Sequence, residues 1–336
     1  MEKRIYLIDY LKALSILMVI FTHYDWKDKT TLFFTLIIAM AVPIFMLISG
    51  FNFTMSYDKK QASSLRELYA PSIIFHRLYR FILPFIIVYI PEMILHGPIR
   101  GEYYTAPQWL LHFIEGGLGP GSYYVPVLIV MLFSFPLIYI AIRRFSYWGV
   151  CLVGIVNLAY EILVTYSHMS GYLYRLLFFR YLLYVALGCY MYFHFQDRKK
   201  YPLPTLALIL MFVAGLSFSV SVYQFGFKPP IFKFWTKTAM PVALYIFPIV
   251  YILIDKCGHK QLPRPFHHFF SEIGKASYHI FLIQMIYYRL FDHIVFPPKP
   301  AIPVVCGNLV ISLAFGYCYY LLESKLSKWI LEKIKR

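Results

Sequence analysis

Apolar stretches about 20 residues long recur ten times along the chain, separated by short polar segments. A helix needs about 20 predominantly apolar residues to cross the hydrocarbon core of a bilayer. The pattern therefore predicts an all-α, polytopic membrane bundle of about ten transmembrane helices. The predicted spans cover residues 5–24, 31–55, 79–96, 123–142, 147–166, 176–195, 203–223, 237–254, 274–293 and 302–323.

The basic residues alternate in density between successive loops. Placing the N-terminus inside puts 21 of the 32 Lys and Arg residues in cytoplasmic segments, 8 in outer segments and 3 within spans. Short cytoplasmic loops of membrane proteins carry such an excess of positive charge. We therefore expect both termini to be cytoplasmic.

The composition excludes an ordinary soluble domain. Of the 336 residues, 60% are apolar and only 14% are charged, whereas soluble domains carry about 25% charged residues. The net charge of +16 is dispersed in small clusters between apolar stretches, which argues against nucleic acid as a partner. Without a repeat or a long polar segment, residues 1–336 are expected to form one transmembrane domain with no appended soluble domain.

The five cysteines are scattered along the chain and form no CxxC pair. Neither a disulfide framework nor a zinc site has such spacing. We expect no metal cofactor.

The longest outer loop, at about 97–122, contains two distinct pieces of sequence. PQWLLHF is suited to a short helix lying in the membrane interface. The glycines of EGGLGPGSYY permit a tight re-entry of the chain. This loop is therefore expected to be structured.

The first predicted span carries ionisable groups at Asp9, Lys12 and His23. A charge within a span costs about 2.5–3.5 kcal/mol on insertion scales, and Asp9, one turn before Lys12, would offset part of that cost. At 100° per residue, His23 returns to within about 20° of the direction of Lys12, about 16 Å further along the axis. The shared face predicts a polar path between helices, although an ion pair and an interfacial histidine would explain the two groups separately.

Two pairs of polar side chains lie in or beside other spans. Glu161 and Arg180 fall at similar depth on consecutive spans, which predicts a structural salt bridge. Arg77 and Arg80 lie at the cytoplasmic start of the third span, where the positive-inside rule would explain them. Paired arginines also suit a bound phosphate or carboxylate.

The last two spans add three more polar side chains. Ser277 and Gln284 lie two turns apart on one helix face, where they would bind a substrate or join neighbouring helices. Glu323 closes the final span at the cytoplasmic boundary. Extension of its side chain to the interface would be enough to explain that position.

Several segments resemble motifs of the acyltransferase-3 family of integral-membrane acyltransferases, and the resemblance spans the whole chain. Asp9-Tyr10-Leu11-Lys12, followed by ten residues and His23, is similar to the family's Arg/Lys-x10-His signature. VPIFMLISGF (42–51) resembles the second-span motif, and HRLYRFILPF (76–85) resembles the basic start of the third span. Weaker likenesses occur at 121–133, 180–188, 274–284 and 321–330.

The resemblance implies transfer of an acyl group, by default acetyl, from cytosolic acetyl-CoA or another acyl-CoA to a hydroxyl of a surface glycan or lipid-linked sugar. It also implies a multi-pass protein of a bacterial plasma membrane. His23, Lys12 and Asp9 become the catalytic candidates. The binding candidates are Arg77, Arg80 and Arg180 for the acyl-CoA, and Tyr124, Ser277, Gln284 and Glu323 for the substrates.

The chain departs from the family pattern in four places. Lys12 stands where arginine is commoner, Tyr123-Tyr124 where Trp-Phe is frequent, and Gln284 where histidine is common. No proline follows Glu323. The first departure keeps the charge, whereas the others leave the acceptor open.

The residues and the resemblance together suggest a mechanism. His23 would act as general base on the sugar hydroxyl, with Lys12 or Arg180 stabilising negative charge. Arg77 and Arg80 would hold the phosphates of CoA. An acyl-histidine intermediate stays open as a second route, and so does a homo-oligomeric state.

A polysaccharide exporter is the alternative function, because helices around a polar interior also suit alternating access. Prolines at 84, 91, 126, 136, 241 and 248 suggest interrupted spans. They show no symmetry between two halves of the chain, which favours the enzyme. A membrane scaffold would not need Lys12 and His23 on a shared face.

Overall fold

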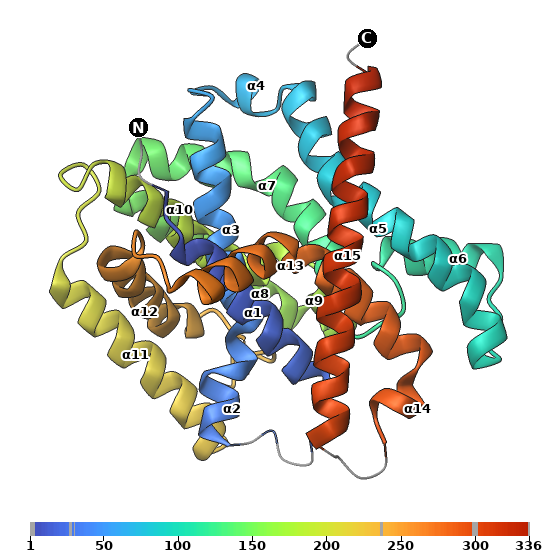
Figure 1. The fold of residues 1–336 in the computed structure, drawn as a ribbon. Helices are drawn as coiled ribbons and strands as arrows, with labels where there is room; N and C mark the ends of the chain where they lie inside the picture. The colour runs from blue at the N-terminus through green and yellow to red at the C-terminus, as the bar shows by residue number, and fades with distance from the viewer. Residues whose placement is uncertain (1–3, 27–28, 30, 236–237, 298–301, 335–336) are drawn as a thin grey trace. The chain divides into compact units, whose positions relative to one another are not determined.

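The computed structural model of the chain describes residues 4–26, 29, 31–235, 238–297 and 302–334. The regular structure in these ranges is helical, without a strand (Figure 1). The predicted class of an all-α membrane protein is confirmed. The chain groups into two compact units, each built from three separate segments: unit 1 is Met1–Ile8, Asp28–Leu78 and Pro126–Lys260, and unit 2 is Asp9–Lys27, Tyr79–Val125 and Gln261–Arg336.

Unit 1 is organised around α10, which is buried along its length from Leu182 to His194. The neighbouring α3 approaches it through glycines. A Cβ atom at Gly50 would lie 2.2 Å from the Val185 carbonyl oxygen, so only glycine allows the two backbones to come so close. The helices of unit 1 are α2 (Leu32–Leu36), η1 (Ile38–Met40), α3 (Ala41–Asp58), α4 (Leu65–Leu68), most of α7 (Tyr124–Phe145), α8 (Tyr147–Tyr166), α9 (Gly171–Leu176), η2 (Phe178–Tyr181), α10 (Leu182–Gln196), α11 (Thr205–Gln224) and α12 (Val242–Cys257).

Unit 2 is held together by α13, which packs closely against two other helices. A Cβ atom at Gly274 would lie 2.1 Å from the Asp9 carbonyl oxygen of α1, and one at Gly316 would lie 2.5 Å from Cα of Ile280. Glycine therefore sets the approach of α1 to α13 and of α15 to α13. The helices of unit 2 are most of α1 (Leu7–His23), most of α5 (Pro71–Arg100), α6 (Ala106–Ile114), α13 (Arg264–Leu290), α14 (Asp292–Val295) and α15 (Ile302–Ile334).

Helices occur at all ten predicted spans; α8 has the predicted boundaries, 147–166, and the others differ. Within the described ranges, six helical stretches are long and apolar enough to cross a membrane, whereas α1, α10 and α12 are shorter and α13 is more polar. The count of ten and the cytoplasmic termini stay predictions. The six stretches are Leu32–Asp58, Leu65–Arg100, Tyr124–Phe145, Tyr147–Tyr166, Thr205–Gln224 and Ile302–Ile330.

The prolines of the third span do not interrupt it. Pro84, Pro91 and Pro98 all lie inside the continuous helix α5. Tyr278 of α13 and Tyr319 of α15 donate hydrogen bonds to the carbonyl oxygens of Phe81 and Pro84, at 2.9 and 2.6 Å. Neighbouring helices therefore supply hydrogen bonds to the backbone near the first proline, and the expected interruption at 84 and 91 is wrong.

The predicted short helix of the outer loop is present as α6. Its Leu110, Leu111 and Ile114 are exposed, while Trp109 packs edge-on against Tyr89 of α5. An apolar exposed face on a short helix beside a span is typical of an interfacial helix.

Candidate active site

Helix α1 positions the three catalytic candidates that the sequence identifies. Asp9 and Lys12 lie one turn apart and form an ion pair at 4.0 Å, which confirms the predicted pair. His23 is the last residue of the same helix. Lys12 and His23 therefore share a regular helix, as their expected common face requires.

Lys12 has further charged neighbours in unit 2. Arg80 of α5 lies close enough for its charge to act on Lys12 and also on Glu323 of α15. One acidic and two basic side chains from three helices therefore interact electrostatically. Opposite charges within such a group lower the cost of keeping each one in the membrane.

His23 lies against the glycine-rich segment that precedes α7. The backbone of Gly121 has a φ of +87°, and a Cβ atom there would lie 2.9 Å from Nε2 of His23 and 3.1 Å from the Phe281 ring. Only glycine fits both this backbone conformation and this space. Tyr124 begins α7 three residues later, and its ring meets Phe281 edge-on at 5.3 Å. The structure thus brings Tyr124 into the surroundings of His23.

The polar face predicted on the ninth span lies on α13. Ser277 and Gln284 are both buried. The amide nitrogen and oxygen of Gln284 have no hydrogen-bond partner among the described residues, and a buried amide without partners is costly. This side chain retains its full capacity to bind a polar group.

Gln284 lies level with a second buried polar group. Because Gly316 of α15 faces Ile280 of α13 and Asn308 of α15 bonds Tyr287, the helices run antiparallel and place Ser312 at the level of Gln284. Ser312 Oγ is also buried without a hydrogen-bond partner in the described part of the chain. The interior of unit 2 therefore has a polar layer at this depth.

Glu323 makes buried contacts that the sequence did not predict. Helix α15 continues to Ile334, and Glu323 is buried with a relative exposure of 8%. It pairs with Nε2 of His279 at 3.1 Å and accepts a hydrogen bond from Ser327. The reason for its position is this buried pair with α13.

Two of the three donor-binding candidates belong to unit 1. Arg77 donates to Ser56 Oγ at 3.1 Å, and its guanidinium lies over the Tyr57 ring at 3.7 Å and the Phe53 ring at 4.5 Å. Arg80 lies one turn further along α5, on the part that belongs to unit 2. The two arginines keep the three-residue spacing seen in the sequence.

Arg180 lies on η2 in unit 1, beside aromatic rings. Its guanidinium lies 4.4 Å from the Tyr181 ring centre and 5.5 Å from that of Tyr174. Glu161 accepts hydrogen bonds from Tyr174 Oη at 2.9 and 3.1 Å. A tyrosine thus mediates between the two groups that were predicted to pair.

A polar cluster at the end of α5 was missed in the sequence. Glu92, His96 and Arg100 recur every four residues, and Glu92 and His96 are fully buried. Exposed apolar residues such as Met93 and Ile94 occupy the other face. Glu92 and His96, four residues apart within the predicted span 79–96, were the available signal.

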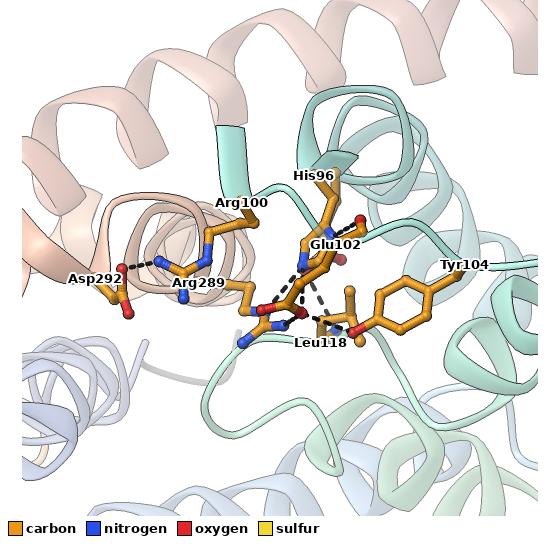
Figure 2. Close-up of polar contacts among 8 residues, drawn as sticks. His96, Arg100, Glu102, Tyr104, Leu118, Arg289 and Asp292 are labelled. Atoms are coloured by element: carbon orange, nitrogen blue, oxygen red, sulfur yellow. Dashed lines mark hydrogen bonds and ion pairs between the residues drawn. The ribbon is translucent and has the colours of Figure 1, made fainter. Parts of the chain in front are cut away.

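The cluster joins α5 to the following loop and to α13 (Figure 2). Arg289 donates to Glu102 Oε2 at 2.6 Å and to Nε2 of His96 at 3.2 Å. Because Nε2 accepts, Nδ1 of His96 carries the proton and donates to the Glu102 carbonyl oxygen at 3.1 Å. The hydrogen bond from Tyr104, together with the charge of Arg289, holds the pKa of Glu102 below its ordinary value.

The cluster also extends to the start of α14 and to the glycine-rich segment. Arg100 forms an ion pair with Asp292, and the Leu118 N–H donates to Glu92 Oε1 at 3.3 Å. Figure 2 shows Arg100 paired with Asp292 beside the group formed by His96, Glu102, Tyr104 and Arg289.

The arrangement in unit 2 combines groups suited to acyl transfer. An imidazole can take a proton from a hydroxyl, and nearby cations and an unpaired amide can stabilise a developing negative charge. Among the described residues, no three His, Cys, Asp or Glu side chains cluster as metal ligands would.

Comparison with known proteins assigns the family. The model of the acyltransferase-3 family, described as an acyltransferase domain, matches residues 5–321. Searches of curated proteins and of solved structures found no match. Because the match covers nearly the whole chain, the protein belongs to the acyltransferase-3 family and is a membrane acyltransferase.

Proposed function

We propose that the protein transfers an acyl group, by default acetyl, from cytosolic acyl-CoA to a hydroxyl of a cell-surface or exported glycan, or of its lipid-linked precursor. The proposed site of action is a bacterial plasma membrane. The observation that carries the proposal is the position of His23, whose Nε2 lies against the Gly121 backbone on the helix that also carries Lys12.

His23 is the proposed general base. It ends α1 on the side that the charge distribution assigns to the outside, where a glycan acceptor would arrive. A neutral imidazole has a pKa near the working pH and is therefore suited to accept the hydroxyl proton. Tyr124 and Phe281 lie around the same segment and offer aromatic surface to a sugar ring.

The donor is proposed to bind from the cytosolic side. Arg77 and Arg80 lie one turn apart on α5, and guanidinium groups bind phosphates through paired hydrogen bonds. The charge of Arg80 reaches Lys12, so cationic side chains extend from the phosphate site towards the interior. Arg180 is the third proposed contact of the donor.

The reaction is proposed to proceed by direct attack. The acceptor oxygen bonds to the thioester carbonyl carbon while His23 takes the hydroxyl proton. The amide of Gln284 stabilises negative charge on the carbonyl oxygen. Lys12, about 16 Å from His23 along the axis of α1, adds to this stabilisation through the longer-range effect of its positive charge. The carbon–sulfur bond then breaks, and the imidazolium returns the proton to the sulfur, which leaves an O-acyl ester and free CoA.

Buried groups around the reacting centre would orient it. Asp9 pairs with Lys12 and would keep its ammonium in place. Glu323 pairs with His279, two residues after Ser277 on α13. Ser277 and Glu323 are thus proposed to line the substrate path.

The test is transfer of radiolabelled acetyl from acetyl-CoA to an envelope glycan fraction by the purified protein in lipid vesicles, followed with release of the CoA thiol. Wild type is expected to transfer label and His23→Ala to lose transfer. His168→Ala is the matched control, because His168 is exposed in unit 1. Transfer by His23→Ala at the wild-type rate would contradict the proposed mechanism.

A further inference from the structure

Glu92 has contacts that the proposed reaction does not use. It lies in a predicted span with its side chain fully buried. Oε1 accepts the Leu118 N–H at 3.3 Å, whereas Oε2 has no hydrogen-bond partner in the described part of the chain. The charge of Arg289 acts on this carboxyl group. Because a buried acid in a span is costly, such a group is a candidate for a function.

The segment that Glu92 contacts is a run of alternating glycines, residues 116–121. A Cβ atom at Gly117 would lie 2.9 Å from Glu92 Oε2, and one at Gly119 would lie 2.2 Å from the Met285 carbonyl oxygen. At Gly121 the nearest atom is Nε2 of His23. The alternate glycines thus contact α5, α13 and α1 in turn.

Positive φ angles at 116, 117 and 121 give this segment a backbone that side chains disfavour. Such a segment keeps one conformation only when its surroundings hold it. On the α5 side, the bond from Leu118 to Glu92 holds the middle of the segment three residues before Gly121. A shift of the segment would therefore move the backbone that lies against His23.

We propose that Glu92 is a positioning residue for the acceptor side of the reaction. It holds residues 116–121 against His23, and this segment forms the wall along which the acceptor hydroxyl reaches the imidazole. The inference rests on the proposed function and assigns a role to a carboxylate that does not itself touch the reacting atoms. Because the donor is assigned to the arginines at the cytoplasmic end of α5, Glu92 acts on the acceptor alone.

The activity test compares Glu92→Ala, Glu92→Gln and Glu92→Asp in vesicles. Loss of one hydrogen bond to the segment is expected to lower kcat/KM for the acceptor roughly tenfold in Glu92→Ala, with an unchanged KM for acetyl-CoA. Glu92→Gln keeps an accepting oxygen and is expected to restore most of the activity. Glu92→Asp keeps the charge but withdraws it by one methylene, so it tests the contact if the alanine variant does not fold.

Glu115→Ala is the matched control. Glu115 precedes the segment by one residue and pairs with His112 of α6 at 3.3 Å. It is expected to transfer acetyl at the wild-type rate. Equal loss in Glu115→Ala and Glu92→Ala, or a raised KM for acetyl-CoA in Glu92→Ala, would indicate general damage and overturn the proposal.

Hydrogen exchange of residues 113–122 separates this inference from the proposed function, because it needs no activity. Glu92→Ala is expected to speed exchange at Leu118 and its neighbours about tenfold, while Glu92→Gln and Glu115→Ala remain close to wild type. Unchanged exchange in Glu92→Ala would overturn the inference even if wild type transfers acetyl. Absence of transfer by wild type would refute the proposed function. Faster exchange in Glu92→Ala would then show that Glu92 anchors the segment, but the role assigned to it in acyl transfer would be overturned.

Discussion

Gly121→Ala tests the contact between the glycine-rich segment and His23. The new methyl carbon would lie 2.9 Å from Nε2 of His23 and 3.1 Å from the Phe281 ring. Ordinary contacts between such atoms are about 3.5–4.0 Å, so the imidazole or the segment must move by about 0.5–1 Å. A displacement of about 1 Å from productive geometry can lower a rate about 100-fold.

A second effect of this substitution is conformational. Alanine at a φ of +87° is strained by about 1–2 kcal/mol. This strain lowers the stability of the folded protein whether or not the new methyl group touches His23. Gly226→Ala is the matched control, because Gly226 has a φ of +63° and no described atom lies within 4 Å of its Cβ position. Gly226→Ala reports the loss of thermal stability from this strain alone, and Gly121→Ala is expected to lose at least as much because it adds the close contacts with His23 and Phe281.

The assay is steady-state acetyl transfer in vesicles, measured with the thermal unfolding temperature of each variant. Gly121→Ala is expected to lower kcat about 100-fold, while Gly226→Ala keeps the wild-type kcat. The reasoning is refuted if folded Gly121→Ala transfers acetyl at the wild-type rate, or if the two variants lose activity equally.

Three further predictions concern charged groups of unit 2. Lys12→Met should lower kcat about 100-fold, because it removes a group that stabilises developing negative charge. Lys12→Arg keeps the positive charge, so its kcat should stay within a few-fold of wild type. Equal rates for the two variants would exclude a role of the charge. Glu323→Ala leaves His279 without its partner and should lower the free energy of unfolding in detergent by about 1–3 kcal/mol. Glu323→Gln should lower it by less. Identical free energies of unfolding for the two variants would contradict this prediction. Folding lowers the pKa of Glu102, so the ionised Glu102 carboxylate stabilises the folded protein. This stabilisation is fully present above the unfolded pKa of about 4.3 and is lost as the pH falls through the lower folded pKa. Unfolding temperatures measured from pH 7 to pH 3 should show this loss in wild type and not in Glu102→Gln.

Periodicity in the sequence predicts where helices form but not where they end. The apolar windows mark the part of a helix that lies in hydrocarbon, and α13 and α15 both continue in polar sequence beyond it. Glu323 illustrates the consequence, because a residue assigned to a boundary lies inside a helix and pairs with His279. Its partner is 44 positions away, and local sequence does not specify such contacts.

The spacing of Lys12 and His23 could be predicted because both lie on one regular helix. The glycine-rich segment was expected to be tightly folded, but its contacts with α1, α5 and α13 depend on the packing of helices distant in sequence. Glu92 could have been singled out as an acid within a predicted span, but its contacts depend on the same packing. Its role follows from the Leu118 N–H and Gly117, which the sequence places far from it.

Mass spectrometry of the envelope glycan tests the central claim most directly. Cells lacking this gene would be complemented with wild type, with His23→Ala or with His168→Ala. The account predicts a mass difference of one acyl unit per modified sugar in the wild-type and His168→Ala strains, and none in the His23→Ala strain. Identical glycan masses with and without the gene, or full acylation by His23→Ala, would contradict it.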